Sequence, residues 1–291
     1  MKSRYRQMNW FYLPALAIML FFVAWPFIQT VQISLMRWNG YGKVKTYIGF
    51  SNYISMFKDA NFGLSLRNTL IYGVCCTVLQ NVFGLALALL VNTRFRGNGV
   101  VRTIVYMPIM IAGVVMGYIM YFFLTYNRGI LNDILSVVGM EPKDWLASPF
   151  YSVFFITLVN SWQYVGNSMV MYLAGLQNIP TAYYEAAAVD GVTGWQRFVH
   201  ITLPLLMPSI QTSVVTNLIG SLKLYDVIVA LTNGGPGKRS MFMSYVIYMY
   251  GFQKNKMGYA AAYAVIFFIL VGIFTIVLFK TQKEQLFGEE E

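Results

Sequence analysis

The stretch NTLIYGVCCTVLQNVFGLALALLVNT, residues 68–93, contains no charged residue. A helix needs about 20 predominantly apolar residues to cross the hydrocarbon core of a bilayer. Lipid offers the backbone no hydrogen-bond partner, so a segment buried in lipid must be helical. The stretch therefore predicts a membrane-spanning helix near residues 68–92.

Similar apolar stretches lie on both sides of this one. Residues 7–36, 103–127, 145–184 and 257–279 are uncharged, and residues 198–222 contain only His200 as a titratable side chain. One such stretch is compatible with a short buried helix, but a whole series of them is not. We expect an all-α integral membrane protein with six transmembrane helices in one transmembrane domain, residues 1–291. The expected spans lie near 11–35, 68–92, 103–124, 150–176, 205–230 and 259–280.

The composition excludes several other classes of protein. Only 11% of the residues are charged and 57% are hydrophobic, whereas soluble domains carry charge on about a quarter of their residues. The net charge of +10 is spread over all the loops and forms no basic stripe with interleaved aromatics, which excludes a nucleic-acid-binding surface. Lys2, Arg4 and Arg6 precede an apolar run that is too long for a signal peptide, so we expect a retained first helix.

The loop between the fourth and fifth spans, residues 177–204, has its own helical pattern. Pro180 suits the start of a short helix over residues 181–190, and Gly191 suits its C-terminal stop. Thr193 and Gln196 have the spacing of a capping box, which predicts a second short helix that runs to about Val199. This pattern fits a docking element for another protein, and it also fits a loop that packs on its own membrane domain.

The same loop resembles the EAA loop of binding-protein-dependent ABC permeases of the carbohydrate-uptake branch, which includes maltose, multiple-sugar and glycerol-3-phosphate importers. The resemblance is carried by Glu185-Ala186-Ala187, then Gly191, then Ile201-x-Leu203-Pro204. Val192 departs from the alanine that is usual in the family. Further family-like segments are Gly49-Phe50-Ser51-Asn52-Tyr53, Gly84 to Leu90, Gly129-x-x-Asn132, and Leu231-Thr-Asn-Gly-Gly-Pro236.

The resemblance implies a function and a set of partners. It implies that the loop is a coupling helix that docks on a cytoplasmic ATPase, so that both termini are also cytoplasmic in a bacterial plasma membrane. The implied docking residues are Glu185, Ala186, Ala187, Asp190, Gly191, Leu203 and Pro204. The implied partners are a second related permease subunit, two ATPase subunits that bind ATP and Mg, an extracytoplasmic solute-binding protein, and a carbohydrate substrate. Lysines and arginines are divided almost evenly between the two sides of the expected topology, so charge alone does not orient the chain.

The sequence offers no catalytic constellation of its own. Gly237-Lys238 follows glycines, but Thr232 stands where a phosphate-binding loop needs its first glycine, and Arg239 displaces the hydroxyl residue. His200 is the only histidine, and no cluster of nucleophiles or metal ligands accompanies it. We expect a transport subunit and not an enzyme. A gradient-driven secondary transporter or channel is the alternative, and a membrane enzyme is a weaker one.

Polar residues inside the fourth and fifth spans are candidates for a substrate pathway. Asn160, Tyr164 and Asn167 fall on one face of the fourth span. The fifth span contains Thr216 together with the polar residues Gln211, Thr212, Ser213, Asn217 and Ser221. Such residues in lipid either bind helices to each other or line a pathway, and the sequence leaves both alternatives open.

Near the outer end of the fifth span stand Lys223, Tyr225 and Asp226. On a continuous helix the two charged residues would be neighbours that neutralise each other. We expect Tyr225 and Asp226 near the outer mouth of a sugar cavity, with Lys223 balancing the charge. The alternative is a purely structural ion pair.

The loop before the last span, residues 233–259, is expected to face the solute-binding protein. Lys238 and Arg239 follow the Gly234-Gly235-Pro236 turn and are suited to an acidic partner surface.

Overall fold

The computed structural model describes residues 12–93, 95–237 and 240–287. The described chain is mostly helical, with one antiparallel ribbon of β1 (Met36–Arg37) and β2 (Thr46–Tyr47), in which Met36 pairs with Tyr47. The chain divides into two compact units. The first unit holds the residues up to 63 together with 243–270, and the second holds 64–242 together with the residues from 271 onward.

The first unit is built around its N-terminal helical segment and the first part of α16. Phe27 and Phe268 join α3 to α16, with ring centroids 4.4 Å apart. The Asn52 amide donates to the carbonyl oxygens of Ser34 (2.8 Å) and Met36 (2.9 Å), which satisfies the carbonyls where α3 ends. The elements of this unit are α2 (Tyr12–Met19), the π-helical turn η2 (Leu20–Ala24), α3 (Trp25–Ser34), α4 (Ser51–Phe57), the start of α5 (Ala60–Asn92), α15 (Met243–Tyr248), the π-helical turn η5 (Met249–Gln253) and the start of α16 (Met257–Phe287).

Asp59 is the only acidic residue in the sequence of the first unit, and its carboxylate is fully engaged. Its Oδ2 accepts hydrogen bonds from the hydroxyls of Tyr250 (2.5 Å), Tyr259 (3.2 Å) and Tyr263 (3.2 Å). Its Oδ1 accepts from the backbone N–H and the side-chain amide of Asn61, both at 2.9 Å. Burial raises the pKa of Asp59, but the hydrogen bonds, with that from Tyr250 the largest, outweigh burial and leave the pKa below its ordinary value. The carboxylate is therefore ionised at neutral pH.

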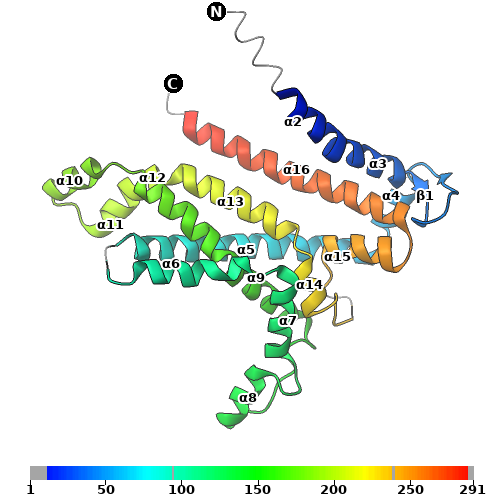
Figure 1. Cartoon of the computed structure of the whole chain (residues 1–291), viewed down its shortest axis with the longest axis horizontal. Helices are drawn as coiled ribbons and strands as arrows, with labels where there is room; N and C mark the ends of the chain where they lie inside the picture. The colour runs from blue at the N-terminus through cyan, green and yellow to red at the C-terminus, as the bar shows by residue number, and fades with distance from the viewer. Residues whose placement is uncertain (1–11, 94, 238–239, 288–291) are drawn as a thin grey trace, which may run out of the picture. The chain divides into compact units, whose positions relative to one another are not determined.

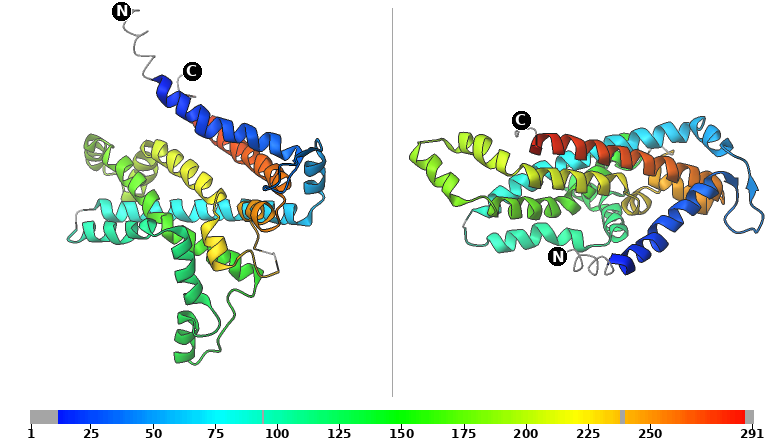
Figure 2. Two further views of the ribbon diagram at one scale, coloured as in Figure 1. Left: turned by 45° about the vertical axis from the view of Figure 1, so that its right-hand side comes forward. Right: turned by 90° about the horizontal axis from the view of Figure 1, so that it is seen from above.

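The second unit contains the helices that carry the candidate sites. A helical hairpin of α10 and α11 lies at the end of α9 and α13 that is farthest from α14 (Figures 1 and 2). The elements are most of α5, α6 (Asn98–Tyr106), the 3-10 turn η3 (Met107–Met110), α7 (Gly113–Leu124), α8 (Ile130–Val137), α9 (Pro149–Gln177), α10 (Thr181–Val189), α11 (Gly194–Arg197), the π-helical turn η4 (Phe198–Thr202), α12 (Leu203–Leu205), α13 (Met207–Leu222), α14 (Asp226–Leu231) and the end of α16.

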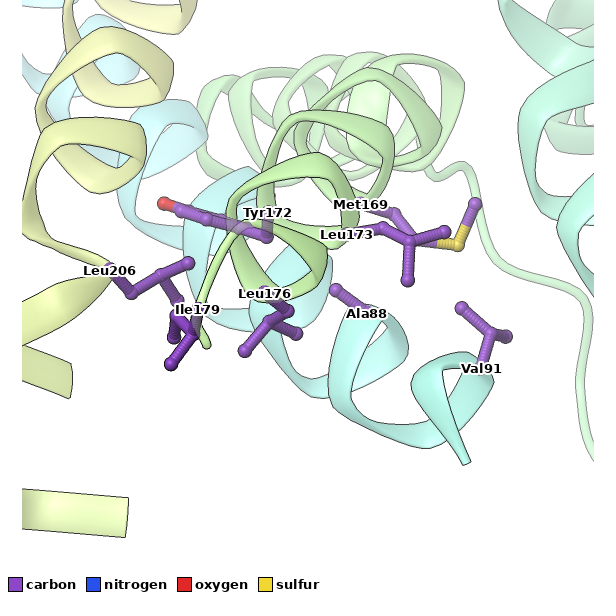
Figure 3. Packing of buried hydrophobic residues seen from close by; sticks show 8 residues of the cluster. All are labelled: Ala88, Val91, Met169, Tyr172, Leu173, Leu176, Ile179 and Leu206. Atoms are coloured by element: carbon purple, nitrogen blue, oxygen red, sulfur yellow. The ribbon is translucent and has the colours of Figure 1, made fainter. Parts of the chain in front are cut away.

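A hydrophobic cluster of the second unit lies between α5 and α9 (Figure 3). Ala88 and Val91 of α5 pack with residues of α9 and with Leu206, which is fully buried. Small residues let the two helices approach closely, because a Cβ added at Gly84 would lie 2.4 Å from the Cβ of Ser168. The α9 side and its continuation contribute Met169, Tyr172, Leu173, Leu176 and Ile179.

This contact predicts the effect of a larger side chain at Gly84. Gly84→Val is expected to destabilise the chain by about 1–3 kcal/mol, the usual cost of overpacking a tight interface. Gly63→Ala on the same helix is the matched control, because a Cβ there meets nothing within 4 Å. Thermal unfolding in detergent should show a lower midpoint for Gly84→Val and an unchanged or higher midpoint for Gly63→Ala. Equal midpoints for the two variants would contradict the close approach of α5 and α9.

Three helical segments are long and apolar enough to cross a membrane, namely Tyr12–Ser34, Ala60–Asn92 and Met257–Lys280. Two bent pairs raise the number to as many as five: Asn98–Met110 with Gly113–Leu124, bent by 100°, and Gly194–Leu205 with Met207–Leu222, bent by 66°. The uncharged helix α9, 29 residues long, contains amide side chains such as Asn160, Gln163 and Asn167 and is outside this set.

Two of the expected spans are therefore not single straight helices. The span expected near 103–124 is broken at Ile111 and Ala112, whose backbones are extended. The span expected near 205–230 begins at Met207, with Pro208 in the first turn of α13, ends at Leu222 and resumes as α14 at Asp226. The span expected near 68–92 begins earlier, at Ala60.

Candidate functional site

The loop between α9 and α13 folds into the two short helices that its sequence predicts. The first helix, α10, ends at Val189, and Gly191 follows with a φ of +67°. The N–H of Val192 donates to the carbonyl of Ala187 (3.0 Å), and the N–H of Gly191 donates to that of Ala188 (3.3 Å). This pair of bonds is a Schellman motif, which needs a left-handed residue at the glycine position. Gly191 is therefore the residue that lets the chain reverse after α10.

The second helix, α11, begins with the predicted capping box. The hydroxyl of Thr193 accepts from the Gln196 N–H at 3.3 Å, and the Thr193 N–H donates to Gln196 Oε1 at 3.0 Å. The only histidine, His200, has its Nδ1 3.0 Å from the carbonyl of Gln196, which is a local contact within the helical segment. The hairpin is thus held by its own backbone and capping contacts.

Two large apolar side chains of the hairpin are exposed. Val189 is 87% exposed and Trp195 is 74% exposed. Large exposed apolar side chains among polar ones are common at protein–protein contact sites. The hairpin therefore presents a surface that suits a protein partner.

The residues expected to dock differ in their exposure. Glu185, Ala186 and Asp190 are exposed, as are Gly191 and Pro204, while Leu203 is half-buried. Ala187 is only 5% exposed, so its side chain lies on the inner face of the hairpin and not on the outer surface.

A second candidate site is a cavity of about 330 Å³ inside the second unit. It is lined by residues of α5, α9, α13, α14 and the η3–α7 segment. All six residues that the sequence singled out as candidate pathway residues line it: Asn160, Tyr164, Asn167, Thr216, Tyr225 and Asp226. Hydroxyl and amide groups of this kind are the donors and acceptors that a polyhydroxylated ligand would use.

The cavity lies where two helices are interrupted. Ile109 and Gly113 flank the break before α7, and Lys223 to Tyr225 form the break between α13 and α14. The broken backbone is partly satisfied from α9, because Gln163 Nε2 donates to the Ile111 carbonyl at 2.8 Å. Interrupted helices at membrane depth occur where the backbone is buried in protein or lines a cavity, and such breaks commonly form transport sites.

Asp226 is held in a way that the sequence did not predict. Asp226 makes no ion pair with any described residue. The chain is not helical between Lys223 and Asp226, so these two side chains are not helical neighbours. Asp226 instead is the first residue of α14 and packs against Gly113, the first residue of α7; a Cβ added at Gly113 would lie 3.2 Å from Asp226 Oδ2. The positive ends of two helix dipoles thus lie beside the carboxylate. The premise of a helical neighbour pair with Lys223 is wrong.

Further polar residues line the cavity, and one of them, Gln80, was not among the residues that the sequence singled out. Gln80 of α5 and Asn217 and Ser221 of α13 line the same cavity and are almost fully buried. Gln80 Nε2 donates to Asn160 Oδ1 at 3.3 Å, which fixes the amide that faces the cavity. The adjacent amides Gln80 and Asn81, in the interior of the uncharged stretch 68–93, were the available signal, since polar residues in a span usually face the interior. Lys238 and Arg239, expected to meet a solute-binding protein, lie outside the described residues.

The chain is similar in sequence to membrane components of known transport systems. Residues 80–283 match the family model described as "Binding-protein-dependent transport system inner membrane component". The chain is 33% identical to the trehalose/maltose transport system permease protein of Thermococcus litoralis over 285 residues, which covers 97% of this chain and 96% of that protein.

Solved structures give the same fold. The chain is similar to a chain in the crystal structure of a bacterial ABC transporter involved in the import of the acidic polysaccharide alginate, with a TM-score of 0.83, 25% identity, and coverage of 97% and 96% of the two chains. It is equally similar to a chain of a bacterial alginate ABC transporter in complex with an alginate pentasaccharide-bound periplasmic protein, with a TM-score of 0.82, 26% identity, and coverage of 95% and 93%. The chain therefore belongs to the family of inner membrane components of binding-protein-dependent transport systems, and it is a multi-pass membrane permease of that family.

Proposed function

We propose that this chain is a membrane-spanning subunit of an ATP-driven carbohydrate importer, that it provides half of the translocation pathway, and that it couples this pathway to cytoplasmic ATPase subunits. The observation that carries the proposal is the convergence of Asn160, Tyr164, Asn167, Thr216, Tyr225 and Asp226 on one cavity beside two helix breaks. The similarity to permeases named for trehalose/maltose and alginate import supports a saccharide as the substrate.

The α10–α11 hairpin is the proposed coupling element. Its exposed Val189 and Trp195 supply apolar contact area, and Glu185 and Ala186 lie exposed beside them. In this proposal Glu185 makes charge-assisted hydrogen bonds to the ATPase, and the exposed Ala186 lets the two surfaces approach closely. Ala187 supports the hairpin from its inner face.

The proposed topology has six spans and cytoplasmic termini. In this topology each of the three long apolar segments, the two bent pairs and the 29-residue helix α9 is one crossing. A coupling hairpin that meets a cytoplasmic ATPase places residues 177–204 and both ends of the chain on the cytoplasmic side. In this arrangement the polar face of α9 lines the cavity and does not face lipid.

The proposed partners are a second related permease, two ATPase subunits and an extracytoplasmic solute-binding protein. ATP and Mg bind to the ATPase subunits, and this chain binds no cofactor. ATP binding closes the ATPase dimer and moves the coupling hairpins, and the cavity then alternates between the two sides of the membrane. The binding protein delivers the carbohydrate to the outward-facing state.

Affinity purification from the native membrane tests this assembly. The tagged full-length chain should co-purify in mild detergent with a second permease and with an ATPase, and the complex should hydrolyse ATP. A variant with Val189→Asp and Trp195→Asp should retain the second permease and lose the ATPase, because the charges interrupt the apolar docking surface. A chain that purifies without any ATPase, or retention of the ATPase by the double variant, would contradict the proposal.

A further inference from the structure

The first unit contains a cavity of about 640 Å³, which none of the six candidate pathway residues lines. It is formed where α3, α4 and η5 end and where α16 begins. Three cationic side chains line it, from three separate segments: Arg37 after α3, Lys58 after α4, and Lys256 before α16. Amide and aromatic groups complete the lining, among them Trp38, Asn39, Asn255 and Tyr259.

The cavity has more positive than negative charge. Three cations face one carboxylate, that of Asp59, and none of Arg37, Lys58 and Lys256 makes an ion pair with a described residue. The Asp59 carboxylate is occupied by three tyrosine hydroxyls and by Asn61. Three like charges around one cavity repel each other, and an anion bound between them would remove this repulsion.

More positive charge surrounds the rim of the cavity. The Lys45 ammonium lies 4.4 Å from the centroid of the Trp38 ring, and that of Lys254 lies 4.6 Å from the centroid of the Tyr250 ring. Trp38 is itself fixed, because its Nε1 donates to the Gly42 carbonyl at 2.6 Å. The aromatic walls therefore hold additional cations near the opening and strengthen the attraction for an anion.

The position of the cavity at the ends of two apolar helices indicates which kind of anion it would meet. The apolar segment Tyr12–Ser34 ends three residues before Arg37, and the apolar segment Met257–Lys280 begins one residue after Lys256. A 23-residue helix is about 34 Å long at about 1.5 Å per residue, slightly more than the hydrocarbon core of about 30 Å. The cavity thus lies at the level of the lipid headgroups, where Trp and Tyr side chains are also commonly found.

We infer that the cavity lined by Arg37, Lys58 and Lys256 binds a phosphate group, and that an anionic phospholipid headgroup is its occupant. The guanidinium group of Arg37 donates in a planar fork that suits phosphate oxygens, and the two lysines add point charges. Basic pockets beside transmembrane helices recognise anionic lipid headgroups by the same chemistry. Bound lipid would hold the end of α3 to the start of α16.

The test compares two double variants of the full-length chain with equal loss of charge. Lys58→Gln/Lys256→Gln removes two lining cations, and Lys43→Gln/Lys143→Gln removes two exposed lysines that do not line the cavity. Each protein is purified in nonionic detergent and titrated with phosphatidylglycerol or phosphatidylcholine, and bound lipid is counted by native mass spectrometry. A thermal midpoint in phosphatidylcholine confirms that both variants are folded.

The wild type and the control should bind phosphatidylglycerol in preference to phosphatidylcholine. The Lys58→Gln/Lys256→Gln variant should bind it about 30-fold more weakly, since each lysine beside anionic lipid contributes about a factor of five. If glycerol 3-phosphate or inorganic phosphate at millimolar concentration displaces phosphatidylglycerol, the site belongs to phosphate as a free solute. If neither displaces it, the site belongs to lipid. Equal affinity of both double variants for phosphatidylglycerol would overturn the inference. If the Lys58→Gln/Lys256→Gln variant kept its lipid affinity but lost binding of an acidic solute-binding protein, the cavity would be assigned to that protein, and the inference would also be overturned.

Discussion

Replacement of Gly191 by valine is expected to lower substrate-stimulated ATP hydrolysis of the assembled importer by about 10-fold or more, which corresponds to about 1.4 kcal/mol of lost coupling. Gly191 has a φ of +67° and closes the Schellman motif after α10. A left-handed conformation costs an ordinary L-residue about 1–2 kcal/mol, and a β-branched side chain is a genuine outlier there. The strain would turn α10 relative to α11 and displace the outer surface of the hairpin.

Gly191→Asn is the matched control for this prediction. Asparagine tolerates the left-handed region, and a Cβ at this position meets nothing within 4 Å. We expect Gly191→Asn to retain most of the ATP hydrolysis, while both variants insert into the membrane at the wild-type level. Normal stimulation of Gly191→Val would show that the geometry of the hairpin does not determine coupling.

The second large effect is expected at Asp226. Asp226→Asn should assemble normally and transport carbohydrate about 10- to 100-fold more slowly, because a hydrogen bond to a charged group contributes about 1.5–3 kcal/mol. Asparagine keeps the volume beside Gly113, and the lost interaction with the two helix N-termini costs only about 0.3–1 kcal/mol each. The measurement is initial uptake by reconstituted vesicles at a fixed amount of assembled complex.

Two further variants separate a pathway role from a structural one. Asp133→Asn in α8 makes the same chemical change at an exposed position that does not line the cavity, and it should transport at the wild-type rate. The double variant Lys223→Met/Asp226→Asn should not recover transport, since the two residues form no ion pair. Recovery of assembly or transport in the double variant would point to a structural pair, and wild-type uptake by Asp226→Asn would exclude the pathway role.

Much of the local structure was predictable from the sequence. Pro180, Gly191, Thr193 and Gln196 are local signals, and the structure confirms the two helices, the left-handed glycine and the capping box that they predict. Such features depend on neighbouring residues in the chain, so a single sequence contains the information needed to place them.

The breaks in the helices were not predictable in the same way. Residues 103–124 are uncharged, so hydropathy gives no sign that the chain turns by 100° between Met110 and Gly113; the local signals are Pro108 and Gly113, which flank the turn. The turn depends on tertiary contacts: Gln163 binds the Ile111 carbonyl, and Gly166 of α9 lies close to the backbone of Val105. The separation of Lys223 from Asp226 has a similar origin, because Asp226 starts a new helix against α7.

The exposure of the docking residues shows a further limit of sequence reasoning. Ala186 and Ala187 are equivalent in the motif, but only Ala186 faces outward, and Ala187 is buried. Which face of a nine-residue helix packs inward depends on the segments that surround it, and not on the composition of the helix. The charged cavity of the first unit is also a product of the fold, since its three cations come from segments far apart in the chain.

Uptake of labelled oligosaccharides by vesicles that contain this chain, its partner permease, the ATPase subunits and the solute-binding protein is the most direct test of the account. We expect uptake that requires both the binding protein and ATP hydrolysis, that stops with a non-hydrolysable ATP analogue, and that is unaffected when ion gradients are dissipated. Uptake that continues without ATP hydrolysis and follows an ion gradient would contradict this expectation, and would identify the chain as part of a gradient-driven carrier.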